Sequence, residues 1–537
     1  MLFNSYIFIF LFLPLTLLGW YGLNRLRFYR CAQAFLIGMS LWFYAYFNVS
    51  YLLVILFSCA VNYLLSAALA GAEKRTGTRA DRRAGTQAGE AQSSTGQGEA
   101  SSNTRCERKL DGAAGKVGTD SLARHRKLIR VLGCVFNLGI LGYFKYADFF
   151  IENINAAFSA DFPLRHILLP LGISFFTFQQ LSFVLDRCRG DAGHYGFVDY
   201  LTFVTFFPQL IAGPIVLHSE LIPQFQDREK RNFHADSFAR GIAYFVIGLS
   251  KKVLLADMLA KPADFGFAHI DGLDSVSLAL SALAYMLQLY FDFSGYCDMA
   301  VGLGKMFGVE LPHNFDSPYQ AVSVRDFWKK WHITLGRFFT TYVYIPLGGS
   351  RRGKLRTMCN TMIVFLLSGL WHGANWTFVV WGMLHGIAVT ANILFPVSEK
   401  DGKRHVLSRV VTFLFTCLTF IIFRSDSLEG AFQYLKGLFS MRYFHSLKAV
   451  AEAVEVPELY IVEKVLSMRA PQYVTMLHMA ELFLLLVVGV ILITRKNARK
   501  RIEGRVLTGS FAAALAVLFA WSVISLSGVS TFLYFNF

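Results

Sequence analysis

Long apolar runs separated by short polar segments are the main pattern along this chain. A helix needs about 20 apolar residues to cross a hydrocarbon core of about 30 Å, and runs near that length recur from one end of the sequence to the other. The pattern predicts an all-α polytopic transmembrane bundle with about 11 to 13 membrane segments. The clearer runs lie near residues 5–19, 31–48, 50–71, 128–150, 239–258, 275–294, 357–379, 380–396, 406–424, 477–494 and 508–526.

Three further runs, near 166–185, 198–217 and 332–346, contain Pro, Gly or polar residues, and we expect broken or re-entrant helices there. The stretch FFPQLIAGPIVLHSELIPQF begins at Phe206 and is interrupted by prolines and a glycine. Backbone carbonyls freed by such breaks must line a cavity or be buried in protein.

Composition supports a membrane protein and argues against a soluble one. Hydrophobic residues make up 54% of the 537 residues and charged residues only 16%, and the mean hydropathy is +0.44. The net charge of +16 comes from basic clusters beside the apolar runs, which indicates positive-inside topology and not nucleic-acid binding. The eight cysteines are scattered singly, so neither disulfides nor a cysteine metal site is indicated.

The basic clusters also predict a topology. Arg25 is the first basic residue, so the first apolar run lacks the leading charge of a secretory signal and is expected to be a retained helix with its N-terminus outside. The clusters at 351–356, 400–404 and 495–501 are then cytoplasmic. A helix running outward from Thr357 would place His372 about 22 Å along it, in the outer half of the membrane.

One segment differs sharply in composition from the rest. Residues 73–127 are rich in Gly, Ala, Ser, Thr, Gln and Arg and cannot bury enough apolar surface to fold. We predict a disordered cytoplasmic loop here, inserted within a single integral membrane domain that covers residues 1–537.

The stretch LSGLWHGANWTF, from Leu367 to Phe378, places polar residues inside an apolar run. In a continuous helix His372, Asn375 and Trp376 would share one face, and His385 would lie about 20 Å from His372, too far to share a metal. Two interpretations remain open. His372 is either a packing residue at a close GxxxG helix contact or a proton acceptor, since its unperturbed pKa near 6.5 suits general-base chemistry.

Two other stretches combine apolar and ionisable residues. In RDFWKKWHITLGRFF, Trp328, Trp331 and His332 fall at helical spacings, which is typical of an interfacial amphipathic helix; that interpretation does not account for His332. In LQLYFDFSGYCDMAVGLGKMFG, Asp292 and Asp298 would lie on different faces of a helix. A structural role is favoured for them over proton relay or cation coordination.

The sequence contains no GxxxxGK[ST] phosphate loop, no HExxH zinc helix and no GxSxG nucleophile elbow. A catalyst built from these parts would use histidine as a base on an activated donor, with no metal.

Taken together, the motifs resemble the membrane-bound O-acyltransferase family, in its alginate O-acetyltransferase branch. WHITLGRFFTTYVYIPLGGSRRG is followed by LSGLWHGANWTFVVWGMLHG. Further similar stretches cover nearly the whole chain in the expected order: LGYFKYADFF, LPLGISFFTFQQLSFVLDRCRG, FFPQLIAGPI, YFDFSGYCDMAVGLGKMFG, NFDSPYQAVSVRDFWKKWH and the terminal FLYFNF. The 73–127 insertion departs from the family pattern.

The resemblance implies a helical bundle that encloses a tunnel with a buried histidine at its centre. It implies acyl transfer from a thioester to a hydroxyl, with His372 as general base and His332 as a second catalytic or positioning residue. From their spacing, Asn375 and Trp376 are candidates for the walls of the site. Trp371, Trp331, Asp292 and Ser294 complete the set of expected site-lining residues.

The resemblance also implies the reaction partners. The donor is acetyl-coenzyme A or another cytoplasmic acyl thioester, and no cofactor is expected to stay bound. The acceptor is an exported or cell-surface polysaccharide, the setting is the bacterial inner membrane with its lipids, and an extracytoplasmic acetyltransferase is an expected partner protein. Alternatives are transfer of D-alanyl or another acyl group to teichoic acid or peptidoglycan, and a transporter or flippase using Asp292, Asp298 and Lys145.

Overall fold

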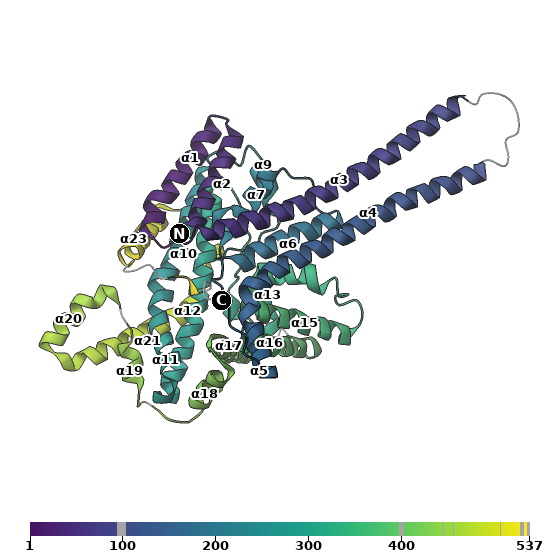
Figure 1. The fold of residues 1–537 in the computed structure, drawn as a ribbon. Coiled ribbons are helices and arrows are strands. Elements are labelled where there is room, and N and C mark those ends of the chain that lie inside the picture. Colours follow the sequence, from purple (N-terminus) through teal and green to yellow (C-terminus); the bar gives the residue numbers. More distant parts are fainter. Residues whose placement is uncertain are drawn as a thin grey trace.

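The computed structural model describes residues 1–93, 104–396, 402–443, 445–454, 456–504, 506–526 and 531–533. These residues form helices and connecting loops and contain no strand, which confirms the predicted all-α fold (Figure 1). The α-helices are α1 (Leu13–Arg25), α2 (Tyr29–Ala45), α3 (Ser50–Ser93), α4 (Thr104–Leu141), α5 (Ala147–Phe158), α6 (Ile173–Arg189), α7 (Phe197–Thr205), α8 (Phe207–Leu210), α9 (His218–Gln226), α10 (Ala235–Ser250), α11 (Asp257–Ala268), α12 (Ser275–Met306), α13 (Val324–Lys330), α14 (Ile333–Phe339), α15 (Lys354–His372), α16 (Trp376–Leu394), α17 (Gly402–Arg424), α18 (Leu428–Leu438), α19 (Leu447–Glu452), α20 (Tyr460–Arg469), α21 (Val474–Ile493), α22 (Ala498–Ile502) and α23 (Gly509–Ile524).

Short π-helical and 3₁₀ turns join several of these helices. The turns are η1 (Phe8–Phe12), η2 (Gly142–Tyr146), η3 (Lys251–Ala256), η4 (Ile270–Gly272), η5 (Pro318–Gln320), η6 (Thr340–Tyr344), η7 (Pro457–Leu459) and η8 (Pro471–Tyr473).

Within the described residues, seven helical segments are long and apolar enough to cross a membrane. This number is below the predicted 11 to 13, because several predicted segments form helices shorter than a full crossing. For example, α2 has 17 residues and α23 has 16. The seven segments are Phe8–Arg25, Ser50–Glu73, Ser121–Phe158, Ser275–Met306, Trp376–Leu394, His405–Arg424 and Pro471–Ile493.

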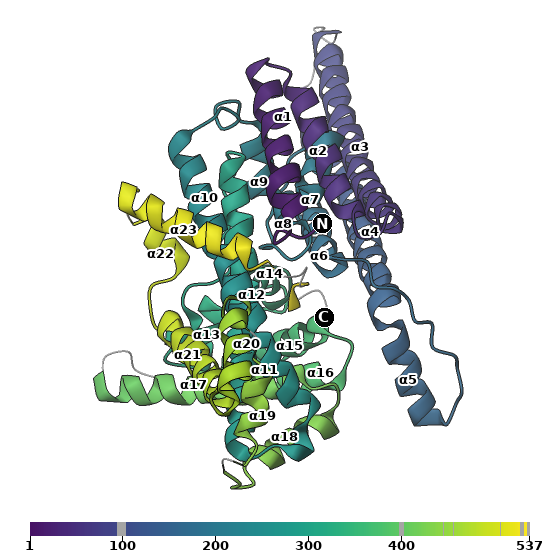
Figure 2. The same cartoon turned by 90° about the vertical axis from the view of Figure 1, so that its left-hand side faces the viewer.

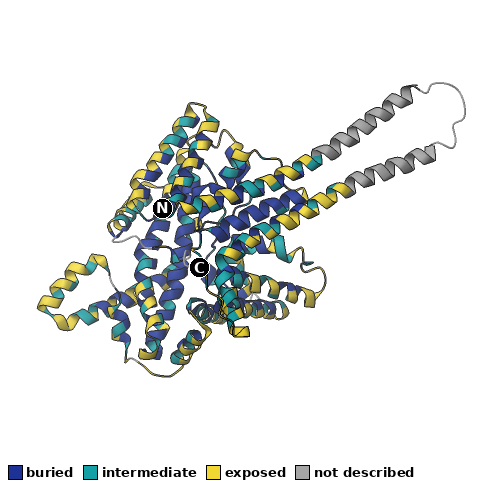
Figure 3. Cartoon of the chain, viewed as in Figure 1, coloured by how far each residue is buried: buried dark blue, intermediate teal, exposed yellow. Residues whose placement is uncertain are grey.

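Helix α12 is the central element of the bundle, and most of its residues are buried (Figures 2 and 3). It packs against α10 through two facing glycine pairs. A Cβ built on Gly248 would lie 2.5 Å from the carbonyl oxygen of Gly295, and one built on Gly241 would lie 2.7 Å from that of Gly302. Small residues at such contacts let helix backbones approach closely. The two helices therefore touch main chain to main chain.

The interrupted segment after α7 is buried in protein, as predicted for a broken helix. Thr205 ends α7, and Phe206 separates it from the single turn of α8. The Gln209 side chain donates a hydrogen bond to the Phe203 carbonyl at 2.8 Å, and the Thr334 hydroxyl accepts one from the Ile215 N–H at 2.9 Å. Side chains thus satisfy backbone groups that the breaks leave free.

The predicted continuous helix 357–379 is wrong at its end. Helix α15 stops at His372, and after three connecting residues the chain turns back into α16 at Trp376. A Cβ on Gly369 would collide with the Phe378 carbonyl and lie 3.2 Å from the Cα of Gly382. The close contact of Gly369 is therefore with the next helix, while Gly373 lies outside any helix and forms no GxxxG face.

The segment 73–127 is entered from both sides by α3 and α4, and residues 94–103 lie outside the described residues. At its base, Glu73 forms ion pairs with Arg126 at 3.0 Å and with Arg187 of α6 at 3.1 Å. The single domain and the disordered cytoplasmic loop stay predictions.

The glycine contact between α10 and α12 generates a stability prediction. Replacing Gly248 with Ala should destabilise the protein by about 1–3 kcal/mol, because the added methyl group has no space against the α12 backbone. Thermal unfolding of the purified protein in detergent measures the effect. Gly38→Ala is the matched control, since a Cβ at this exposed position of α2 meets no atom within 4 Å. Equal unfolding midpoints for the two variants would contradict the proposed contact.

Candidate functional site

His372 is the last residue of α15, and the helix ends there inside the protein. Gly373 follows in an extended conformation, and the Asn375 side chain begins α16 by accepting a hydrogen bond from the Thr377 N–H at 3.1 Å. The last turn of a helix leaves carbonyl groups without helical partners. In the interior of a membrane protein these carbonyls need partners from elsewhere in the chain.

Two side chains from η2 bind the carbonyls at the end of α15. Lys145 Nζ donates hydrogen bonds to the carbonyls of Trp371 at 2.6 Å and His372 at 3.0 Å. The Tyr146 hydroxyl donates to the Leu370 carbonyl at 2.6 Å. A cation at a helix C-terminus also interacts favourably with the helix dipole. Together these contacts hold the backbone that carries His372.

His332 lies at a second break, between α13 and α14, and its backbone is left-handed with φ 46° and ψ 50°. This conformation is costly for a residue with a side chain, and such strain is concentrated at functional sites. The predicted interfacial helix through Trp328, Trp331 and His332 is therefore wrong. Trp331 and His332 are buried, with exposed fractions of 3% and 0%.

Asn314 supports the turn at His332, a role that the sequence analysis missed. Its backbone carbonyl accepts a hydrogen bond from the Ile333 N–H at 3.0 Å. Its side-chain oxygen accepts from the Thr334 N–H at 3.1 Å and from the Thr334 hydroxyl at 2.7 Å. The side-chain amide donates to Cys297 Sγ at 3.4 Å. One buried asparagine thus provides hydrogen-bond acceptors for the first two backbone N–H groups of α14.

The two breaks bring His332 and His372 together. Their ring centroids lie 6.3 Å apart, and the Trp371 ring lies 4.9 Å from His372 and 5.9 Å from His332. Phe293 of α12 approaches His332 at 4.8 Å, and Phe423 of α17 approaches His372 at 5.4 Å. Both imidazoles are therefore enclosed by aromatic side chains from helices far apart in the sequence. This arrangement can accept or donate a proton in surroundings that hold little water.

The Trp371 ring contacts both histidines, whereas Trp331 packs among other aromatic rings next to His332 in the sequence; their assignment as site-lining residues stays a prediction. The Trp331 ring stacks on Phe327 at 5.3 Å and approaches Phe420 at 5.5 Å. Asn375 and Trp376 do not share a helix face with His372, because the chain turns between them. Asn375 caps α16, and Trp376 is 52% exposed and donates a hydrogen bond from Nε1 to Asn153 at 2.8 Å.

Asp292 lies in an ion-pair network around Lys252. Lys252 of η3 lies 2.7 Å from Asp292 and 2.7 Å from Asp257. The other carboxylate oxygen of Asp292 accepts a hydrogen bond from the Leu533 N–H at 2.9 Å. These contacts connect α12 with η3 and with the C-terminal segment, and the assignment of Asp292 to the site lining stays a prediction.

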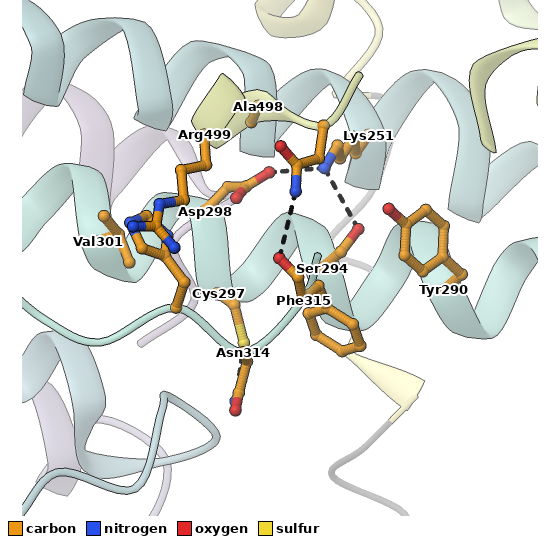
Figure 4. Close-up of a pocket in the computed structure, with 12 residues that line it drawn as sticks. Lys251, Tyr290, Ser294, Cys297, Asp298, Val301, Asn314, Phe315, Ala498 and Arg499 are labelled. Carbon is orange, nitrogen blue, oxygen red and sulfur yellow. Dashed lines mark hydrogen bonds and ion pairs between the residues drawn. The ribbon is translucent and has the colours of Figure 1, made fainter. Parts of the chain in front are cut away.

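Asp298 and Ser294 share a second lysine, Lys251, at distances of 2.6 Å and 3.3 Å (Figure 4). They line a cavity of only about 10 Å³ between α12 and α22. At its rim His313 lies 3.2 Å from Glu503, and burial lowers the pKa of His313 although the Glu503 carboxylate opposes this shift. The cavity is too small for a substrate, so Ser294 orients a lysine here.

His385 is a third buried histidine near the centre, and the sequence analysis placed it too far away because it assumed one continuous helix. The Trp381 ring lies 5.2 Å from the His372 ring and 4.8 Å from the His385 ring. His385 Nδ1 accepts a hydrogen bond from Trp328 Nε1 at 3.1 Å, and its Nε2 lies 3.0 Å from the Thr419 hydroxyl. Both ring nitrogens have protein partners, which indicates a structural role. Among the residues described, no group of three or more His, Cys, Asp or Glu side chains is arranged to hold a metal ion.

The turn at His332 should depend on Asn314. Asn314→Ala removes the side-chain acceptor of two hydrogen bonds and leaves the Thr334 N–H and hydroxyl buried without it, which should destabilise the protein by about 2–4 kcal/mol. Thermal unfolding in detergent measures this. Gln320→Ala, at a partly exposed amide in η5, is the control and should change the midpoint little. An Asn314→Ala protein as stable as the control would refute the role of Asn314.

Comparison with known proteins places this geometry in a family. The model of the membrane-bound O-acyltransferase family matches residues 175–428, which include both histidine motifs. The chain is 37% identical over 475 residues to the peptidoglycan O-acetyltransferase of Helicobacter pylori, covering 82% of this chain and 80% of that protein. It is 36% identical over 445 residues to the probable alginate O-acetylase AlgI of Pseudomonas aeruginosa, covering 82% and 75%.

More distant similarity links the chain to the teichoic acid D-alanyltransferase of Bacillus subtilis, which is 26% identical over 279 residues, covering 49% of this chain and 70% of that protein. The helical membrane fold, the two histidine motifs and the extent of these matches agree with one another. The chain is a multi-pass membrane protein that belongs to the membrane-bound O-acyltransferase family and acts as an O-acyltransferase.

Proposed function

We propose that this O-acyltransferase moves acetyl groups from a thioester donor toward the hydroxyls of a cell-envelope or exported polysaccharide, with His372 as the general base. The observation that carries the proposal is the buried pair of imidazoles, His332 and His372, 6.3 Å apart inside an aromatic enclosure. Each histidine lies at a helix break that brings it out of a regular helix into the interior of the bundle.

The chemistry follows from these two groups. His372 removes the proton of the attacking hydroxyl while its oxygen forms a bond to the thioester carbonyl carbon. The carbon–sulfur bond then breaks, and the departing thiolate takes up a proton, so that an ester and a thiol are produced. General-base catalysis of this kind contributes about 10² to 10⁴ in rate. His332 is placed to orient the hydroxyl or the carbonyl beside His372.

The aromatic enclosure has a role in this reaction. A thioester is also open to attack by water, and an acyltransferase must favour the acceptor hydroxyl over water. Trp371, Trp381 and Phe423 pack within 5.4 Å of the His372 ring, measured between centroids. Exclusion of water from the reacting groups suppresses hydrolysis and strengthens the electrostatic interactions within the site.

The acyl group and the acceptor are inferred from the relatives. Two relatives named for O-acetylation each match 82% of this chain at 36–37% identity, whereas the D-alanyltransferase matches 49% at 26%. Acetyl is therefore favoured over D-alanyl as the group transferred, and a glycan hydroxyl is favoured as the acceptor. Alginate-type polymers and peptidoglycan are both consistent with these names.

The cellular arrangement belongs to the same proposal. The donor, acetyl-coenzyme A or another acyl thioester, is supplied from the cytoplasm, and the protein lies in the bacterial inner membrane. On the topology predicted from the basic clusters, His372 lies in the outer half of the membrane, which suits transfer toward an external acceptor. An extracytoplasmic acetyltransferase is the proposed partner for the final transfer.

His372→Ala should lower acetylation of the exported polymer by about 10² to 10⁴, because the general base is removed. His332→Ala should also lower acetylation. The measurement is the alkali-releasable acetate on polysaccharide from cells that carry each variant as the only copy of the gene. Release of alanine in place of acetate would support the D-alanyl alternative.

The matched control for these variants is His269→Ala, because His269 is an exposed histidine that stacks on Phe265 at 4.3 Å, outside the described centre. Membrane levels of all variants are compared by immunoblotting. If His372→Ala reaches the membrane at normal levels and leaves acetate unchanged, the base mechanism is wrong.

Lys145 should act as a positioning residue, because it holds the end of α15 that carries His372. Lys145→Met removes both hydrogen bonds to the Trp371 and His372 carbonyls, so the turnover number should fall by about tenfold or more while donor KM changes little. Lys145→Arg retains a cationic donor and should recover part of the activity. A loss of stability with unchanged turnover per folded molecule would show that Lys145 serves only the fold.

A further inference from the structure

A wide groove lies at the end of α1, away from the histidine pair. Its volume is about 1040 Å³, which is a hundred times the small cavity of Figure 4. The α1–α2 turn and the α9–α10 connection form it, and these two segments lie side by side at the same end of the molecule (Figures 1 and 2). The Tyr21 and Phe233 rings pack edge to face across it at 5.4 Å.

One end of the groove is strongly cationic. Four arginines line it: Arg25, Arg27, Arg228 and Arg231. Among the described residues, none of these four forms an ion pair with a carboxylate, and no acidic side chain lines the groove. Asp227 and Glu229 flank Arg228 in the sequence but do not contribute to the lining. The lining of the groove therefore carries a net positive charge; the carboxylate of Asp199, which interacts electrostatically with Arg231, lies outside the lining.

Arg231 differs from the other three arginines because it is buried. Its guanidinium donates hydrogen bonds to the carbonyls of Phe225 at 2.6 Å and Tyr29 at 3.0 Å. These carbonyl groups fix its position, and the nearby Asp199 carboxylate interacts with it electrostatically. Arg25, Arg27 and Arg228 are exposed and available to a ligand, and Arg228 lies over the Tyr29 ring at 5.0 Å.

The other end of the groove is apolar. Leu17, Leu18, Tyr21 and Gly22 of α1 contribute to it, and Leu18 is 74% exposed. A Cβ built on Gly22 would meet no atom within 4 Å, so the space in front of this glycine is open. Leu18 precedes Arg25 by about two turns of helix, or roughly 10 Å. The groove thus changes from apolar to cationic along the direction of α1.

This change from apolar to cationic lining matches the boundary between the hydrocarbon core and the headgroups of a membrane. The apolar part of the groove lies on the candidate span Phe8–Arg25, and the arginines begin where that span ends. Basic residues at such a boundary face the headgroups of the bilayer, and each contributes about 1 kcal/mol toward an anionic surface. A ligand with an acyl chain and a phosphate would place each part against its complementary wall.

We propose that this groove is a binding site for an anionic phospholipid, with the phosphate between Arg25, Arg27 and Arg228 and an acyl chain along Leu17, Leu18 and Gly22. Charge complementarity selects an anionic headgroup over a zwitterionic one. The exposed apolar wall and the volume of the groove select a lipid over a free phosphate ion. The site is separate from the histidine pair and does not depend on the proposed acyl transfer.

The test uses the purified full-length protein in non-ionic detergent, titrated with dioleoyl phosphatidylglycerol and followed by native mass spectrometry. The triple variant Arg25→Gln/Arg27→Gln/Arg228→Gln leaves the buried Arg231 in place and should weaken binding by about tenfold or more. The matched control, Arg351→Gln/Arg352→Gln/Arg356→Gln, removes the same charge from another exposed basic cluster and should weaken binding less than twofold.

A second variant tests the apolar wall without changing charge. Gly22→Leu fills the open space in front of α1 and should also weaken phosphatidylglycerol binding, whereas Gly38→Leu, at another open glycine, should not. Unfolding midpoints check that all variants remain folded.

Two ligand controls complete the test. Dioleoyl phosphatidylcholine should bind more weakly than phosphatidylglycerol, and millimolar inorganic phosphate should not displace the lipid. Equal binding of the two lipids, displacement by phosphate alone, or unchanged binding in both the arginine and Gly22 variants would overturn the proposal.

Discussion

Backbone groups released at helix breaks must find partners within the protein, because lipid offers none. The arrangement around His372 and His332 depends on this constraint. α15 can end beside the site because Lys145 and Tyr146 bind its last carbonyls. His332 can adopt a left-handed backbone because the Asn314 side chain accepts hydrogen bonds from the N–H and the hydroxyl of Thr334. Each break leaves a buried histidine at the end of a helix, outside the regular spacing that a continuous helix would give it.

The rest of the bundle provides a rigid frame for these breaks. The α10 and α12 backbones touch through glycine pairs, and two lysines after α10 bind carboxylates on α12, Lys251 with Asp298 and Lys252 with Asp292. Main-chain contact and short ion pairs in a region of low dielectric resist relative movement of helices. The same α12 presents Phe293 to His332. The acidic residues therefore support the histidine pair indirectly, by holding the helix that carries Phe293.

The histidine pair and the groove at the end of α1 differ in chemistry and in location. The histidine pair is enclosed by aromatic rings and suits a reaction that must avoid water. The groove at the end of α1 is open, cationic at one end and apolar at the other, and suits a component of the bilayer itself. Because the two lie apart, the proposed lipid binding and the proposed acyl transfer depend on different sets of residues.

The sequence by itself determined the helical membrane fold and the family and singled out the two histidines as candidates, because each depends on composition, on periodic apolar runs or on short contiguous motifs. It also indicated a broken helix at Pro208, where proline cannot donate a backbone hydrogen bond. Only the tertiary structure decided that α15 ends at His372, that Asn375 and Trp376 turn away, and that Lys145, Asn314 and His385 surround the centre. Helical spacing assumes a continuous helix, whereas a helix ends where distant side chains satisfy its backbone. Those partners are 20 to more than 200 residues away in the chain, as for Asn314 with Thr334 and Lys145 with His372, so no local pattern contains them.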